Sequence, residues 1–222
     1  MAVMVVMDWR CGANSCGVDA EYAPRYAILS HTWGDEEVTF QDLQTPAGTS
    51  MKGFRKILAC CKQARKDGIK WYFRAAVYYT LLEDVPSRNP HFPEAEFREA
   101  RWFTRGWCLQ ELIAPDNVEF YSANWTDIGT KWSLQPLITE ITGITENALR
   151  FRHLEDYSAA QKMSWASTRE TTRDEDLAYC LLSIFGIDMP LLYGEGRNAF
   201  LRLQKEIPAQ NEDYSLLWTD WN

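Results

Sequence analysis

A short segment that sets a carboxylate and an indole at helical spacing holds the residues best suited to chemistry. Residues 101–115 contain three aromatic side chains, both signs of charge and one glycine, and they end at a proline. After Gly106 the apolar residues keep helical spacing, and Glu111 follows Trp107 by four positions, so both side chains lie on one side of a short helix. A carboxylate held there has a fixed position and a raised cost of ionisation. Acid–base chemistry and ribose binding both need such a carboxylate.

The same pattern is also typical of an ordinary amphipathic helix. In that case Glu111 caps a turn or pairs with Arg105, and it takes no part in a reaction. The spacing alone does not separate a chemical role from a structural one, so both interpretations stay open at this point.

Composition indicates a globular, acidic protein. The chain has 222 residues, of which 46% are hydrophobic and 24% charged, and its net charge is −8. This length allows one large domain, or one domain with an appendage. The negative charge argues against sequence-independent nucleic-acid binding and gives no reason to expect an anionic membrane as partner. No apolar stretch reaches a membrane span, and the first seven residues lack the features of a signal peptide, so we expect a cytoplasmic protein.

The six cysteines and three histidines do not form a metal-binding pattern. No Cys-x-x-Cys pair occurs and the histidines are scattered, so the spacing of a zinc site is missing. Four cysteines fall within helical apolar patterns, and we expect them to be small buried side chains in a reducing compartment. These four are Cys60, Cys61, Cys108 and Cys180. We expect no metal and no bound cofactor.

Strand and helix patterns alternate through the first two thirds of the chain, which favours an α/β fold. The predicted strands are residues 25–30, 75–82 and 117–121, and the predicted helices are residues 53–66 and 132–142. Residues 69–73 also read as a strand, but only Arg74 separates them from the next one. Parallel strands need a connection of a dozen or more residues, so this is either one long strand or a place where a crossover is missing. Residues 31–37 form the loop at the carboxyl end of the first strand, where open α/β sheets bind ligands.

Every predicted element from residue 158 onward is a helix. Residues 158–167 and 198–207 fit helices, and the second is expected to end at Pro208. Between them, Thr172 is expected to open a helix through a capping box, and Gly186 to close it after a strict apolar stripe. We expect this helical part to pack on the α/β part rather than form an independent domain.

Six blocks of this sequence, taken in order, resemble the fungal heterokaryon incompatibility (HET) domain. They are YAILSHTWGDEEVTFQDL (26–43), RWFTRGWCLQELIAP (101–115), FYSANWTDIGTK (120–131), ITGI (141–144), KMSWASTRETTRDEDLAYCLLSIFGIDMPLLYGEG (162–196) and AFLRLQKEI (199–207). The resemblance implies a part in the death reaction that fungi mount when genetically unlike cells fuse. HET domains often serve there as effector modules of larger receptor-like proteins.

HET domains in turn resemble TIR domains, which have a flavodoxin-like sheet and several of which split NAD. In plant TIR domains the catalytic glutamate lies in a Trp-Cys-Leu-x-Glu-Leu helix, which residues 107–112 match position by position. The resemblance therefore implies that Glu111 is the catalytic carboxylate and that NAD is a substrate rather than a cofactor. Such a carboxylate can bind the ribose hydroxyls and stabilise the cation that forms as the nicotinamide–ribose bond breaks.

The resemblance also implies a substrate pocket around this carboxylate. Trp33 is suited to stacking, the amide of Gly34 to meeting phosphate and Arg105 to meeting a pyrophosphate. The alternatives are core packing for Trp33, a surface ion pair for Arg105 and a local hydrogen bond for His31. The expected substrate-binding residues are His31, Trp33, Gly34, Asp35, Arg105 and Trp107.

The sequence departs from the HET pattern after Trp71. Typical members carry there the end of a strand, a Ser-rich loop and a further helix, whereas this chain has only Tyr-Phe-Arg before Ala75. In the TIR comparison that block forms one wall of the NAD pocket, so the chain is expected to keep the carboxylate and lack part of its site. Loss of the block also leaves a sheet edge unpaired, which favours aggregation. Real divergence and a wrongly joined gene model both fit this gap.

Four regions are expected: an irregular segment at 1–24, a TIR-like α/β core at 25–150 that lacks one crossover near 71–75, a helical extension at 151–210 and a tail at 211–222. Three functions stay open, namely an NAD-cleaving death effector, a non-enzymatic module that signals by self-association, and an inactive HET remnant. The partners that these functions imply are a second copy, a receptor-like protein or a fused regulatory domain.

Overall fold

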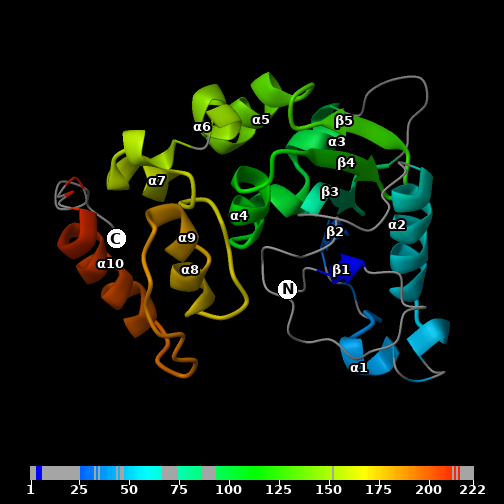
Figure 1. Cartoon of the computed structure of the whole chain (residues 1–222), viewed down its shortest axis with the longest axis horizontal. Coiled ribbons are helices and arrows are strands. Elements are labelled where there is room, and N and C mark those ends of the chain that lie inside the picture. Colours follow the sequence, from blue (N-terminus) through cyan, green and yellow to red (C-terminus); the bar gives the residue numbers. More distant parts are fainter. Residues whose placement is uncertain are drawn as a thin grey trace. The chain divides into compact units, whose positions relative to one another are not determined.

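One group of elements is built on a sheet and a second is built from helices (Figure 1). The computed structural model describes residues 4–6, 26–32, 34, 36–43, 45, 48–66, 75–86, 94–151, 153–211, 213 and 215. Two compact units divide the chain: unit 1 comprises Met1–Phe97 and Pro115–Lys131, and unit 2 comprises Arg98–Ala114 and Trp132–Asn222.

The sheet of unit 1 is mixed and follows the order β1-β2-β3-β4-β5. Its strands are β1 (Met4–Val6), β2 (Tyr26–His31), β3 (Ala75–Leu82), β4 (Val118–Ser122) and β5 (Asp127–Thr130). The three central strands are parallel, and an antiparallel strand lies on each side of them. The three central strands were predicted. The outer two were not, since each is too short to show a period-2 pattern, and β1 lies in the segment expected to be irregular.

β2 and β3 pair directly, with Leu29 opposite Tyr79 and His31 opposite Leu81. We expected an unpaired edge next to the shortened segment. Instead, β2 lies between β1 and β3, and β3 lies between β2 and β4. Both strands therefore have neighbours on their two sides, and that expectation is wrong for the described strands. Residues 69–73, which also read as a strand, lie outside the described part of the chain.

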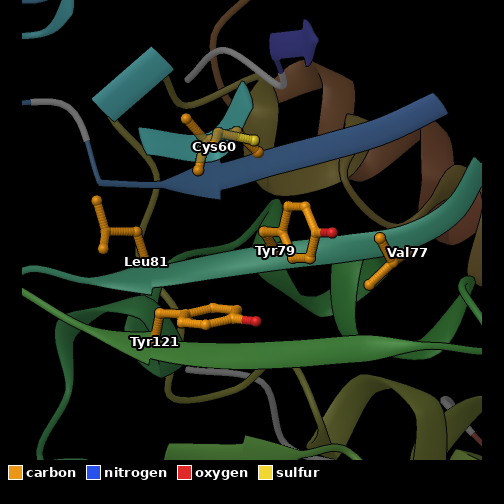
Figure 2. Close-up of a cluster of buried hydrophobic side chains, with 6 residues drawn as sticks. Cys60, Val77, Tyr79, Leu81 and Tyr121 are labelled. Atoms are coloured by element: carbon orange, nitrogen blue, oxygen red, sulfur yellow. The ribbon is translucent and has the colours of Figure 1, made fainter. Parts of the chain in front are cut away.

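One face of the sheet packs against α2 (Phe54–Lys66), the helix predicted at residues 53–66. Side chains alternate along a strand, so β3 sends every second residue to this face. These β3 side chains are Val77, Tyr79 and Leu81. They pack with Cys60 of α2 and Tyr121 of β4 in one buried cluster (Figure 2). The rings of Tyr79 and Tyr121 meet edge to face, with centroids 5.8 Å apart. On β4, Phe120 meets Phe97 of α3 (Glu94–Arg98) at 5.4 Å between ring centroids.

The described elements of unit 2 are helices, and all but the last are short. They are η3 (Arg101–Thr104), α4 (Cys108–Ile113), α5 (Gln135–Thr142), α6 (Glu146–Phe151), η4 (Leu154–Asp156), α7 (Ala159–Ser164), α8 (Asp176–Tyr179), α9 (Leu182–Phe185) and α10 (Asn198–Asn211). A capping box starts α7, in which the Ser158 hydroxyl accepts from the Gln161 amide. Within the described chain, no helix is long and apolar enough to cross a membrane.

Two predictions about the last helices are wrong. The helix expected to start at Thr172 starts after Glu175, whose carboxylate accepts from the amides of Gly194 and Gly196. It is also divided into α8 and α9, because ψ relaxes to −7° at Cys180 and −14° at Leu181, away from about −42° in a regular helix. Gly186 ends α9 at φ 67°, as predicted.

The last helix was expected to end at Pro208, but α10 continues through it to Asn211. A proline removes one backbone donor and crowds the preceding turn, which usually stops or bends a helix. Here only three residues of the helix follow the proline, and its missing N–H removes one helical hydrogen bond. That loss does not end the helix.

Candidate functional site

Two of the four loop residues predicted to bind a ligand are described in unit 1. His31 is the last residue of β2, and Gly34 lies in the loop that follows. Trp33 and Asp35 fall outside the described residues. The hydrogen bonds of this loop meet at the side chain of its last residue, Glu37, which the sequence pattern did not single out.

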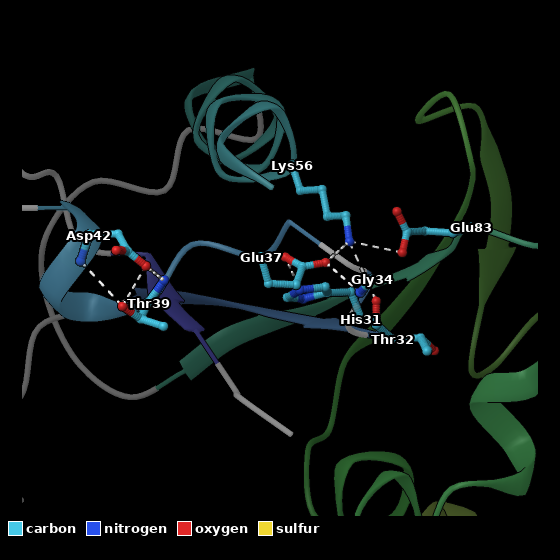
Figure 3. A network of polar contacts seen from close by, with 8 residues as sticks. All are labelled: His31, Thr32, Gly34, Glu37, Thr39, Asp42, Lys56 and Glu83. Atoms are coloured by element: carbon cyan, nitrogen blue, oxygen red, sulfur yellow. Dashed lines mark hydrogen bonds and ion pairs between the residues drawn. The ribbon is translucent and has the colours of Figure 1, made fainter. Parts of the chain in front are cut away.

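The Glu37 carboxylate is held by three groups (Figure 3). One oxygen lies 3.2 Å from Nε2 of His31, and the other accepts from the Gly34 amide at 2.9 Å and from the Lys56 ammonium. The side chain is only 8% exposed. Burial raises the pKa of Glu37, but the hydrogen bonds from Lys56 and Gly34 outweigh it and lower the pKa overall. Glu37 is therefore a buried, ionised carboxylate.

Lys56 of α2 forms hydrogen bonds with the loop after β2 and with the turn after β3. Besides Glu37, its ammonium donates to Glu83, in the turn after β3, at 2.8 Å and to the Thr32 carbonyl at 3.4 Å. An ammonium has three hydrogens, so all its donors are used. Because its side chain is 13% exposed, this pairing is stronger than that of a surface ion pair.

His31 is buried, and its ring forms a hydrogen bond with the Glu37 carboxylate. Burial, followed by the charge of Lys56, lowers the pKa of His31 despite the opposing effect of Glu37. The ring is therefore neutral at pH 7. Its Nδ1 has no hydrogen-bond partner among the described residues. The contact with Glu37 is the kind of local hydrogen bond that was the structural alternative for this histidine.

A cavity of about 450 Å³ opens beside this network, at the carboxyl ends of β3 and β4. Gly34, Glu37, Lys56 and Glu83 line it on one side, and the turn that holds Trp125 lines it on another. Its volume lies in the range of small-molecule sites. The edge of a parallel sheet where it lies is the usual place for such a site.

In unit 2, Glu111 is fixed by the start of α4. Trp107 is the N-cap residue, and the Glu111 amide donates to the Trp107 carbonyl at 3.4 Å, so the two residues are one turn apart as the spacing predicted. The Glu111 side chain is 7% exposed. Gly106 allows this start, because a Cβ there would lie 2.5 Å from the Thr171 methyl and 3.1 Å from Sγ of Cys180.

A buried arginine, Arg169, shares this core with Glu111. It donates to the Trp165 carbonyl at 3.1 Å and to the Arg105 carbonyl at 2.9 Å, and its side chain is 6% exposed. Burial lowers the pKa of Arg169 to about 10, while Cys108, Cys180 and Glu111 act in the opposite direction. Glu111 and Arg169 therefore attract each other across the core. Arg169 lies within a block that resembles the HET domain, but nothing in the local pattern marked it.

The cysteines around Glu111 are unreactive. Burial, and then the charge of Glu111, raises the pKa of Cys108 well above its usual value, and burial raises that of Cys180 to about 12. Neither is a thiolate near neutral pH. The structure thus confirms buried cysteines at Cys60, Cys108 and Cys180, whereas Cys61 is only partly buried.

Arg105 contributes to unit 2 mainly through its backbone. It forms a parallel bridge with Glu170, and the flanking amides complete the ladder: Gly106 N donates to Glu170 O at 2.9 Å and Glu170 N to Thr104 O at 2.7 Å. Its Nε is buried and has no partner within the described part of the chain.

Comparison with known proteins finds one informative relative. The chain is 41% identical to vegetative incompatibility protein HET-E-1 of Podospora anserina over 219 aligned positions, which take up 83% of this chain and 16% of that protein. The chain thus spans a small part of that relative. No family model and no solved structure matches it. By sequence, the chain is similar to one segment of a much longer fungal incompatibility protein.

Proposed function

We propose that this chain is a HET-type module that acts in fungal non-self recognition, where it triggers the death of the cell. The observation that carries the proposal is the 41% identity to a vegetative incompatibility protein over most of the chain. The ordered HET-like blocks of the sequence support the same role. Because the chain corresponds to a segment of a longer relative, the module is expected to act together with a receptor-like partner or a fused regulatory domain.

The proposed chemistry is cleavage of NAD by Glu111. Its support is the match of residues 107–112 to the catalytic helix of plant TIR domains, together with the fixed position of Glu111 on α4. A carboxylate in a water-poor environment stabilises a nearby cation far more than one in bulk water does. The charge of Glu111 acts to raise the pKa of Arg169, so a buried guanidinium lies within electrostatic reach of this carboxylate.

The reaction breaks the bond between the nicotinamide nitrogen and the ribose. The bonding pair leaves with nicotinamide, which becomes neutral and needs no general acid. Glu111 stabilises the cationic ribose, water adds to it, and a proton is released. The products are nicotinamide, ADP-ribose and one proton.

We further propose that unit 1 is a shortened TIR-like sheet. Three adjacent parallel strands with helices between them support it. The aligned stretch also counts 219 positions but takes up only 83% of this chain, so the relative has residues within the match that this chain lacks. The proposed module therefore lacks part of the usual α/β core, near residues 71–75, and both real divergence and a wrongly joined gene model still fit this gap.

Incubation of the purified chain with NAD tests the chemistry. Nicotinamide release is expected from the wild-type chain, with an almost complete loss in Glu111→Gln, which keeps the shape and removes the charge. The exposed Glu99, also in unit 2, provides the matched control Glu99→Gln, which should keep full activity. Equal release from both variants, or no release from the wild-type chain, rejects NAD cleavage by Glu111.

The burial of Glu111 favours a second candidate, a non-enzymatic module that signals by self-association. A carboxylate that is 7% exposed and lies near a buried arginine also fits a purely structural role. In that case the chain kills cells, and killing survives Glu111→Gln as long as the variant folds. Light scattering of the purified chain would then show assemblies larger than a monomer.

A further inference from the structure

We propose that the cavity of unit 1 binds a small sugar phosphate, a ligand that combines hydroxyl groups with a phosphate. The cavity of about 450 Å³ is large enough for a molecule of this kind. All its lining residues belong to unit 1, whereas Glu111 belongs to unit 2. The proposal therefore does not rest on NAD cleavage.

Glu83 and Asn124 supply the groups that hydroxyls need. One Glu83 oxygen accepts from Lys56, and the other carries no hydrogen bond among the described residues. The Asn124 side-chain oxygen accepts from the hydroxyls of Ser122 at 2.8 Å and Thr126 at 3.0 Å, which leaves its amide nitrogen as a donor. A sugar hydroxyl both donates and accepts, so it can use such a pair.

The first turn of α2 supplies the positive charge. Arg55 lines the cavity from this turn, and Lys52 lines it from the segment just before the helix. Lys52 is paired with Glu36 at 3.0 Å, whereas Arg55 forms no ion pair within the part of the chain that the structure describes. A guanidinium offers parallel donors that match a phosphate, so Arg55 is the group best placed to bind one.

Trp125 gives the cavity an aromatic wall in a strained backbone conformation. Its φ is 63°, a region that residues other than glycine rarely adopt. The turn is fixed by a hydrogen bond from its amide to the Ser122 carbonyl at 2.8 Å, and the indole packs edge to face on Tyr79 at 6.4 Å. Strain of this kind persists where the surroundings impose it and is concentrated at binding sites. An indole at a cavity wall can cover the apolar face of a sugar ring.

The mixture of charges excludes simpler ligands. An apolar molecule would meet six charged side chains, namely Glu36, Glu37, Lys52, Arg55, Lys56 and Glu83. A bare cation would compete with Lys56, which already lies between two carboxylates. A bare anion would approach those same carboxylates. A ligand with hydroxyls at one end and an anion at the other can place its hydroxyls near Glu83 and Asn124 and its anion near Arg55.

Titration calorimetry of the full chain with ribose 5-phosphate tests the proposal. Saturable binding is expected, with ribose and inorganic phosphate each binding at least about tenfold more weakly. Arg55→Met and Glu83→Gln should each weaken binding by about tenfold, while Arg150→Met, at an exposed arginine of unit 2, should leave it unchanged. Adenosine monophosphate is a second probe: if it binds more tightly than ribose 5-phosphate, the natural ligand is a nucleotide, and if more weakly, a free sugar phosphate.

Two results would overturn the proposal. One is the absence of saturable binding at millimolar concentrations of both probes. The other is binding that neither Arg55→Met nor Glu83→Gln weakens, since Arg55 is exposed and its loss should not unfold the chain. Repeating the titration with Glu111→Gln separates this proposal from NAD cleavage, because binding should survive a change that stops nicotinamide release.

Discussion

The two units each bury a carboxylate, and they hold it in different ways. Glu37 in unit 1 is bound by an ammonium that also reaches the exposed Glu83 and lines a cavity. Glu111 in unit 2 lies on a helix near Arg169, whose hydrogen bonds go to backbone carbonyls. The first arrangement borders a cavity, whereas the second pairs a nearly buried carboxylate with a buried guanidinium nearby. A buried carboxylate alone therefore does not show whether the residue binds a ligand, takes part in a reaction or stabilises the fold.

The largest expected effect comes from Arg169→Met in unit 2. The change leaves the Trp165 and Arg105 carbonyls without their buried donor and removes the cation near Glu111, so the free energy of unfolding should fall by about 3–5 kcal/mol. Chemical denaturation measures this. Adding Glu111→Gln to Arg169→Met should recover part of the loss, because it removes a buried charge from which the nearby cation has been taken away. Full stability in the single variant would show that Arg169 and Glu111 do not depend on each other.

Lys56→Met is the matching change in unit 1, and its expected effect is smaller. Glu37 keeps the Gly34 amide as a donor, so the loss of stability should be about 2 kcal/mol. In a double-mutant cycle with Glu37→Gln, the two losses should not add, since both remove the same interaction. Additive losses in denaturation would contradict the network in Figure 3.

Gly106→Ala tests the close packing at the start of α4. The added methyl would lie 2.5 Å from the branched Thr171 side chain, and relieving that contact should cost about 1–3 kcal/mol. Adding Thr171→Ser removes the methyl concerned and should restore part of the stability in thermal unfolding. Gly34→Ala is a useful comparison, because the nearest atom there is at 3.7 Å. Equal losses at both glycines would refute the packing argument.

The smallest expected effect is on the pH dependence of stability. The pKa of His31 in the folded chain lies below its ordinary value of 6.5. The unfolded chain therefore takes up a proton first as the pH falls, and stability that is complete above pH 6.5 is lost below it. We expect a loss on the order of 1 kcal/mol between pH 7.5 and 5.5, which His31→Gln should reduce and His153→Gln, at an exposed histidine, should not. Equal pH dependence in all three chains would contradict a neutral, buried His31.

The sequence was most informative where periodicity is strong and local. It predicted the three parallel strands, the helix α2 and the helical position of Glu111 one turn after Trp107. It did not predict the Glu37–Lys56–Glu83 network, because these residues are far apart along the chain and meet only when β2, α2 and β3 assemble. Arg169 was missed for the same reason. The capping box expected at Thr172 would use the Glu175 carboxylate, but this carboxylate accepts from the Gly194 amide instead, which only the tertiary structure decides.

The most direct test of the central claim is the survival of fungal cells after induced expression of three chains: wild type, Glu111→Gln and Glu99→Gln. The viable fraction and the cellular NAD content are measured in the same cultures. Wild type and Glu99→Gln should kill cells and deplete NAD, while Glu111→Gln should do neither at equal protein levels. Killing by folded Glu111→Gln at the wild-type rate, without loss of NAD, would contradict the claim that this carboxylate carries the function.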